Sequence, residues 1–198
     1  RPTGVRNRKC QKTQKTVNYA ILNGSSSDYG MPYASGFRYT SSFFSAVSND
    51  ILDGTIGPGE VDCARRLAEI LENRSAGYPP VEQFSGAERG RAASLLGQLG
   101  SSEYRAAIAE SAYGEFDQSL AIGILYGLAS SGCDSDGSSL AAIRRLVRAA
   151  GNRETAVIKA ACDALYAVIR YSAGETALDG TRLLTDFLRD PYDEPVRV

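Results

Sequence analysis

Apolar residues recur three, four or seven positions apart along most of the chain after Phe37, which is the period of a helix with one buried face. The pattern is clearest in TAVIKAACDALYAVI at 155–169, where small alanines separate the bulky residues. The bulky positions there are Val157, Ile158, Leu165, Val168 and Ile169. This segment predicts a helix that is buried along a broad face, with Leu165 in the core.

Short breaks divide the second part of the chain into helices. Each break contains Gly, which closes a helix, and several contain the Ser, Asp or Asn that opens the next one. The helices predicted between the breaks are 86–99, 102–113, 117–131, 138–150, 153–171 and 175–189. Taken in order they form three antiparallel pairs, and we expect little or no sheet.

The first part of the chain is less regular. We predict helices at 13–22, 37–52 and 60–73, with a loop rich in Gly, Ser and Tyr at 23–36. The sequence GYPP at 77–80 cannot continue a helix, because its two prolines lack backbone donors. The predicted organisation is therefore a basic arm, a Tyr/Gly-rich loop and a helical cap at 1–84, followed by the paired helices at 85–198.

A repeat runs through the paired helices. Three segments align on Leu96, Leu125 and Leu165, which are 29 and 40 residues apart. In this register the apolar residues Leu99, Leu128 and Val168 coincide, and so do Tyr126 and Tyr166. A period of about 40 residues with two helices per unit is typical of an α-solenoid.

The end of the chain, DPYDEPVRV, adds a family resemblance. Asp190-Pro191 and Val196-Arg197 match the opening of the first helix in HEAT and HEAT-like repeats, so 85–198 resembles that family. The resemblance implies an all-α, right-handed α-solenoid of antiparallel helix pairs, here preceded by an irregular helical N-terminal cap. It also implies that the second helices line a concave surface and that the chain stops inside a further unit.

Composition narrows the chemistry that the chain can perform. The net charge of -1 gives no overall field toward nucleic acid or membrane, and residues 85–198 hold 12 basic and 15 acidic residues. His is absent, which removes the commonest general base and metal ligand, and the four cysteines form no C-x-x-C pair. No phosphate-binding glycine motif occurs. We therefore expect no catalytic site, no metal and no cofactor.

The termini and the apolar runs bear on location. No apolar run approaches the roughly 20 residues that span a bilayer. The chain does not begin with Met, which fits a mature exported protein or a piece of a longer one. Residues 1–15 carry six basic residues and no acidic one, so they are either an arm for an acidic partner or membrane surface, or a solvated leader.

The strongest candidate for a binding surface is a set of arginines on the second helices of the pairs. In SSLAAIRRLVRAA at 138–150, the apolar period leaves three arginines facing outward. With the equivalent helices, the candidate residues are Arg105, Arg144, Arg145, Arg148 and Arg182. Such a strip suits carboxylates or phosphates, which Arg binds bidentately. The alternative is a solvated face with local ion pairs, for example Arg182 with Asp179 or Asp186.

Two further features have an open interpretation. Tyr29, Tyr33 and Tyr39 form either a recognition surface or a group that packs on the first helices. The segment 134–137, DSDG, begins like a calcium loop but lacks the later ligands, so we interpret it as the cap of the helix that follows.

These patterns predict a non-catalytic scaffold that binds a protein or peptide, with an acidic partner suited to the arginines, in the groove of a solenoid. Three alternatives stay open: a structural segment of a larger assembly, a nucleic-acid binder of the helical-repeat kind, and an enzyme whose site lies in the Tyr-rich loop.

Overall fold

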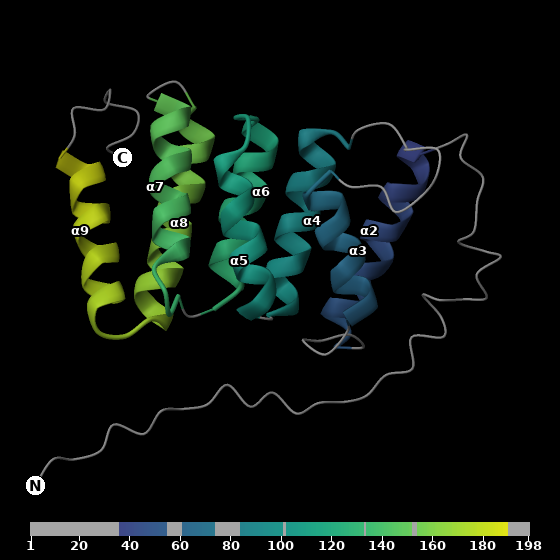
Figure 1. The fold of residues 1–198 in the computed structure, drawn as a ribbon, viewed down its shortest axis with the longest axis horizontal. Coiled ribbons are helices and arrows are strands. Elements are labelled where there is room, and N and C mark those ends of the chain that lie inside the picture. The colour runs from purple at the N-terminus through teal and green to yellow at the C-terminus, as the bar shows by residue number, and fades with distance from the viewer. Residues whose placement is uncertain are drawn as a thin grey trace, which may run out of the picture.

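The computed structural model describes residues 36–54, 61–73, 84–100, 102–132, 134–151 and 154–189. Over these ranges the chain is all-α, with eight α-helices, one short 3-10 helix and no strand (Figure 1). The α-helices are α2 (Gly36–Leu52), α3 (Val61–Leu71), α4 (Gly86–Leu99), α5 (Ser102–Glu110), α6 (Gln118–Ser130), α7 (Ser138–Ala150), α8 (Thr155–Tyr171) and α9 (Glu175–Arg189), and the 3-10 helix is η1 (Ser111–Tyr113). No described helix is both long and apolar enough to cross a bilayer.

The helices predicted within these ranges are confirmed, with ends that move by a few residues at most. The helix predicted at 102–113 is divided, because α5 ends at Glu110 and the last turn tightens into η1. Ser111 supports this change, since its hydroxyl donates to the Ala107 carbonyl oxygen at 3.0 Å. The helix predicted at 13–22 and the boundary predicted at 77–80 lie outside the described residues, as does the predicted loop except for Gly36.

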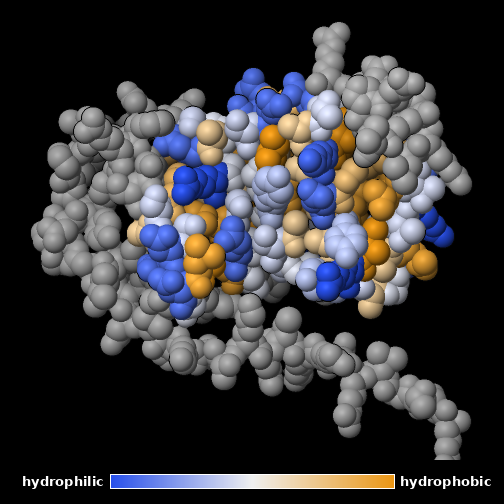
Figure 2. All heavy atoms as spheres, turned by 180° about the vertical axis from the view of Figure 1, so that it is seen from behind, coloured by the Kyte–Doolittle hydropathy of each residue, from blue (hydrophilic) through white to orange (hydrophobic). Residues whose placement is uncertain are grey.

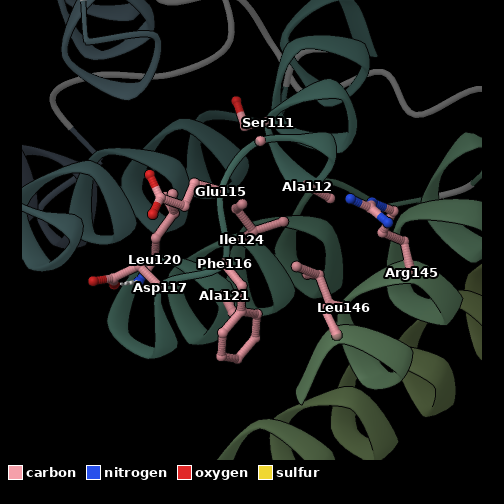
Figure 3. Close-up of a pocket in the computed structure, with 12 residues that line it drawn as sticks. Ser111, Ala112, Glu115, Phe116, Asp117, Leu120, Ala121, Ile124, Arg145 and Leu146 are labelled. Atoms are coloured by element: carbon pink, nitrogen blue, oxygen red, sulfur yellow. Dashed lines mark hydrogen bonds between the residues drawn. The ribbon is translucent and has the colours of Figure 1, made fainter. Parts of the chain in front are cut away.

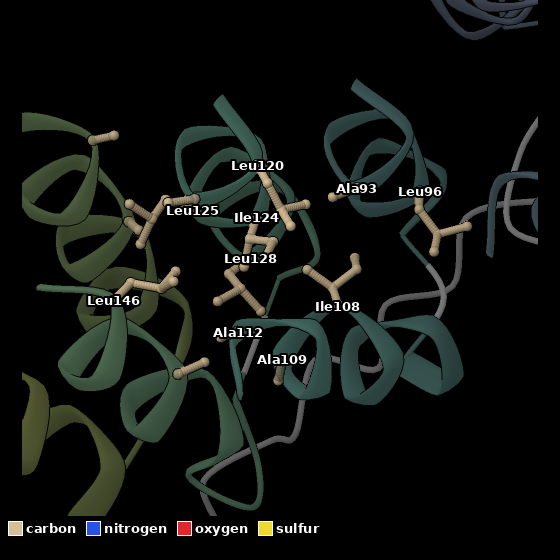
Figure 4. Close-up of a cluster of buried hydrophobic side chains, with 14 of the residues drawn as sticks. Ala93, Leu96, Ile108, Ala109, Ala112, Leu120, Ile124, Leu125, Leu128 and Leu146 are labelled. Atoms are coloured by element: carbon tan, nitrogen blue, oxygen red, sulfur yellow. The ribbon is translucent and has the colours of Figure 1, made fainter. Parts of the chain in front are cut away.

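The paired helices lie in two layers. One layer contains α4, α6 and α8, with α6 between the other two, and the second contains α5 and α7 (Figure 4). Helix α9 packs on α8 and α7 at one end of the array, and α2 and α3 pack on α4 at the other (Figure 1). Segments about 30 to 40 residues apart in the chain are therefore neighbours in space.

The register of the repeat is visible in the burial of its residues. Leu96, Leu125 and Leu165 are completely buried, which confirms the core position predicted for Leu165. The residues three positions after each of them are buried as well: Leu99, Leu128 and Val168. Tyr126 and Tyr166, which coincide in the same register, are 46% and 62% exposed. The residues aligned in the sequence as apolar are thus buried in all three helices.

Glycines allow α4 and α6 to make the most extensive contact between any two described helices. A Cβ atom at Gly123 would overlap backbone atoms of Gly90, and one at Gly97 would overlap the backbone of Gly127. Only glycine permits backbones to approach so closely. The sequence pattern did not predict this glycine seam, which we define as Gly90, Gly97, Gly123 and Gly127.

Candidate binding surface on helix α7

The start of α7 is fixed by the two carboxylates that precede it. Asp136 Oδ1 accepts hydrogen bonds from the Ser138 backbone N–H at 3.1 Å and from the Ser138 hydroxyl at 2.7 Å. Asp134 Oδ2 accepts from the Leu140 N–H at 3.2 Å. The interpretation of this segment as a helix cap is confirmed, although Gly137 itself occupies the N-cap position. Within the described ranges, no three potential ligand side chains are grouped to hold a metal ion.

Arg105 of α5 ties this cap to the neighbouring helix of the same layer. Its side chain is 6% exposed, its Nη2 donates to Ser135 Oγ at 3.2 Å, and it forms ion pairs with Asp134 at 3.9 Å and Asp136 at 3.6 Å. We had expected Arg105 to face outward with the other candidate arginines. The structure shows that this expectation was wrong, because its side chain is buried. It is buried because the connection between α6 and α7 folds over it and supplies the carboxylates that a buried cation requires.

The pKa values of the two carboxylates are shifted in opposite directions. Burial raises the pKa of Asp134 above its usual value. The hydrogen bonds from Ser138 lower the pKa of Asp136 to about 2. Ser172, next to the C-terminus of α8, joins the same cluster, because its hydroxyl accepts from the Asp134 N–H at 3.0 Å. This polar cluster fixes where α7 begins and therefore which side chains of α7 face outward.

The outward face of α7 carries three arginines. Arg144, Arg145 and Arg148 are exposed, and the apolar residues predicted on the opposite face are buried. Neither Arg144 nor Arg148 has an ion-pair partner among the residues that the structure describes. Arg145 lies with its guanidinium carbon 5.8 Å from the centroid of the Tyr113 ring, a cation–π arrangement.

The other candidate residues do not join this group. Arg182 on α9 is 75% exposed and pairs with Asp179 at 3.0 Å, which is one of the local pairs considered as the alternative. Tyr39 lies in α2, but its side chain is outside the described part of the structure, as are Tyr29 and Tyr33 altogether. On the face seen from behind, apolar patches alternate with hydrophilic ones, so this face is not uniformly basic (Figure 2).

A shallow cleft of about 60 Å³ lies beside Arg145, where the turn after η1 meets α6 and α7 (Figure 3). Its buried lining residues are apolar: Ala112, Leu120, Ala121, Ile124 and Leu146. Arg145 stands on one side of this floor, with Glu115 and Asp117 on the other. The cleft is far smaller than the roughly 300–1,000 Å³ of a typical small-molecule site.

Sequence reasoning did not find this cleft. Its residues come from the turn at 111–117 and from α6 and α7, which are brought together only by the packing of one pair on the next. One local signal was present, because Glu115 and Asp117 flank an aromatic residue, Phe116, immediately before an expected helix. Asp117 serves that helix directly, since its carboxylate accepts from the Leu120 N–H at 2.8 Å.

A comparison with known proteins finds a relative without a described function. The chain is 37% identical over 125 residues to an uncharacterized protein of Treponema pallidum (strain Nichols), a match that covers 63% of this chain. It covers 24% of the relative, so the chain spans about a quarter of that protein's length. No protein-family model and no solved structure matches the chain. The chain is thus all-helical over the residues that the structure describes, and its relative is uncharacterized.

Proposed function

We propose that this protein is a non-catalytic scaffold, a right-handed solenoid of HEAT-like helix pairs that binds an acidic segment of another protein across its second helices. The observation that carries the proposal is the outward face of α7, where Arg144 and Arg148 are exposed and have no ion-pair partner among the described residues. They lie four residues apart and therefore on one stripe of the helix. Two guanidinium groups so placed suit a pair of carboxylates.

The contrast with other helices supports a binding role for these arginines. On α3, Arg66 pairs with Glu69 at 3.0 Å, and on α9, Arg182 pairs with Asp179 at the same distance. Both pairs join residues three apart on one helix, which is the usual way that a surface arginine is neutralised. Helix α7 contains no acidic residue at all. No described residue forms an ion pair with Arg144 or Arg148, which leaves their charge available to a partner.

The packing of the pairs supports the solenoid. The first helices α4, α6 and α8 are stacked in chain order, and α5 and α7 are neighbours in the second layer. Such stacking gives an extended surface on the second helices, to which α7 contributes. A scaffold of this kind binds through surface complementarity and does not require the His or cofactor motifs that the chain lacks.

A selection experiment tests the proposal without knowledge of the natural partner. Peptides are selected from a random phage-displayed library on the wild-type protein and are then titrated against Arg144→Glu/Arg148→Glu. The control is Lys159→Glu/Arg170→Glu, which reverses two exposed charges on α8, in the other layer. We expect acidic peptides whose affinity falls at least tenfold with the α7 reversal, depends on salt and is unchanged in the control. Neutral peptides that bind both double variants equally would refute the arginine surface.

A second candidate function is a structural segment of a larger assembly, and exposed apolar residues at the α8–α9 end favour it. Leu178 is 60% exposed and Tyr171 is 57% exposed. The preceding helix pairs, by contrast, are each packed against the pair that follows. If this end is an assembly contact, sedimentation of the purified chain should show association that Leu178→Lys abolishes. A monomer at all concentrations would argue against self-assembly through this end.

A further inference from the structure

We propose that the cleft beside Arg145 receives one branched aliphatic side chain of the bound peptide, with a carboxylate of the same peptide on the Arg145 side. This inference rests on the proposed function and specifies the anchor of its partner. The anchor joins an apolar group and an anionic group within one or two residues, because the floor of the cleft and the guanidinium group are adjacent (Figure 3).

The size and lining of the cleft select the apolar group. Its volume of about 60 Å³ is several times the roughly 10–15 Å³ that one water molecule needs. A side chain such as that of Val fits a space of this size, and the floor offers it buried aliphatic groups, including Ile124 and Leu146. Phe116 and Tyr113 are 36% and 56% exposed beside the cleft, so apolar contact extends beyond the floor.

The charges at the rim select what flanks that apolar group. Arg145 is held against Tyr113, so less side-chain freedom is lost when it binds a carboxylate. On the opposite side, Asp117 is engaged as the cap of α6, and Glu115 is an exposed carboxylate. A second acidic residue of the peptide would therefore be repelled there, whereas a basic one would be attracted. The complementary order is acidic, aliphatic, basic.

Rigid elements hold both sides of the cleft. Leu120 and Ile124 lie on α6, and Leu146 lies on α7, where all three are buried in the core. When a ligand binds to a preformed apolar site, the free-energy cost of ordering the site is small. The cleft is thus suited to fix the position of a peptide whose acidic residues contact Arg148 and Arg144.

The helix α7 offers a matched pair of variants that separate the cleft from the surrounding surface. Ala149 is exposed and lines the cleft, so Ala149→Leu should fill it from the solvent side. Ala141 is exposed on the same helix but does not line the cleft, so Ala141→Leu is the control. Both changes keep a strong helix former at an exposed position, and circular dichroism checks that both variants fold.

The probe is the synthetic peptide acetyl-Gly-Asp-Asp-Val-Lys-Gly-amide, compared with the same peptide in which Gly replaces Val. Titration by nuclear magnetic resonance measures millimolar affinities and locates the shifted resonances. We expect the Val peptide to bind wild type about tenfold more tightly than the Gly peptide, from burial of its side chain. Ala149→Leu should remove this advantage, and Ala141→Leu should keep it.

The outcomes separate this inference from the proposed function. If both peptides bind wild type equally and both are lost in Arg144→Glu/Arg148→Glu, the cleft is overturned and the arginine surface stands. If Ala149→Leu binds the Val peptide as wild type does, the cleft is also overturned. If neither peptide binds at millimolar concentration, the cleft is overturned, and the phage-selected peptides decide independently whether the arginine surface binds.

Discussion

At the scale of single residues, the buried cation of Arg105 has the largest structural consequence. A charge removed from water is tolerated only when opposite charges and hydrogen bonds replace its hydration. Asp134, Asp136 and Ser135 supply these, all from the connection between α6 and α7. Because the same carboxylates accept from the first turn of α7, one cluster both neutralises Arg105 and orients the proposed binding helix.

Removal of the cation should therefore destabilise the fold strongly. Arg105→Met should lower the free energy of unfolding by about 3–5 kcal/mol, because the buried Asp134 loses its compensating charge. Adding Asp134→Asn should recover part of this loss, since the amide oxygen can still accept from the Leu140 N–H. Urea unfolding of wild type, both single variants and the double variant measures the coupling. Strictly additive changes would show that the two residues do not act together.

The pKa of Asp136 predicts a dependence of stability on acid. This pKa falls from its usual 3.8 to about 2 in the folded protein, so the carboxylate favours folding above pH 3.8, and the contribution disappears as the pH falls through 2. The raised pKa of Asp134 acts in the opposite sense, since its contribution is lost as the pH rises. The difference in unfolding midpoint between wild type and Asp136→Asn should be constant above about pH 5 and shrink toward pH 2. A difference that stays constant down to pH 2 would contradict this assignment.

At the scale of elements, helix boundaries were predictable because they depend on local chemistry. Ser85 and Glu88 form a reciprocal capping box at the start of α4, and Gly100 adopts a positive φ of 73° after its end. The contact between α4 and α6 was not predictable in the same way. A glycine inside a helix indicates a close approach only when the opposing helix is known, and Gly90 and Gly123 are 33 residues apart in the chain.

The glycine seam leads to a paired prediction. Gly123→Ala should destabilise the protein by about 1–3 kcal/mol, because the new methyl group overlaps the backbone of Gly90 and the gain in helix propensity of about 1 kcal/mol does not offset this. Gly114→Ala is the control, since its Cβ would meet only the Ser111 carbonyl oxygen, at an ordinary contact distance of 3.7 Å. Thermal unfolding should show a clear loss for the first variant and little change for the second. Equal effects would mean that the seam has room to adjust.

At the scale of the whole molecule, the sequence was sufficient for the all-α class and for the outward position of Arg144, Arg145 and Arg148, because both follow from one helical period. It was not sufficient for Arg105, whose burial depends on a loop about 30 residues later, or for the cleft. The superhelical path and its handedness depend on the angle between successive pairs, which periodicity within a helix does not encode.

Contacts across the predicted boundary between 1–84 and 85–198 bear on how the molecule unfolds. Arg89 Nε donates across it to the Leu71 carbonyl oxygen at 2.9 Å, and on its N-terminal side the Phe84 N–H donates to Asn73 Oδ1 at 2.8 Å. The Arg91 guanidinium carbon lies 5.6 Å from the centroid of the Phe44 ring. One continuous core cluster joins buried residues of α2 and α3 to those of the later helices. We therefore expect the two parts to unfold in one transition.

The absence of Trp from the chain provides a direct test of this expectation. Phe43→Trp places a fluorescent reporter on α2 and Phe187→Trp places one on α9, both at partly buried positions against the core. In a single cooperative unit, both fluorescence transitions coincide with the circular dichroism transition in urea. An array that behaves as separable helix pairs would instead lose the α2 signal or the α9 signal first, because each pair would then be held only by its immediate neighbours. For the fluorescence and circular dichroism transitions to coincide, α3 and α4 must be coupled as strongly as α6 and α8. The hydrogen bonds of Arg89 and Asn73 provide a physical basis for the coupling between α3 and α4.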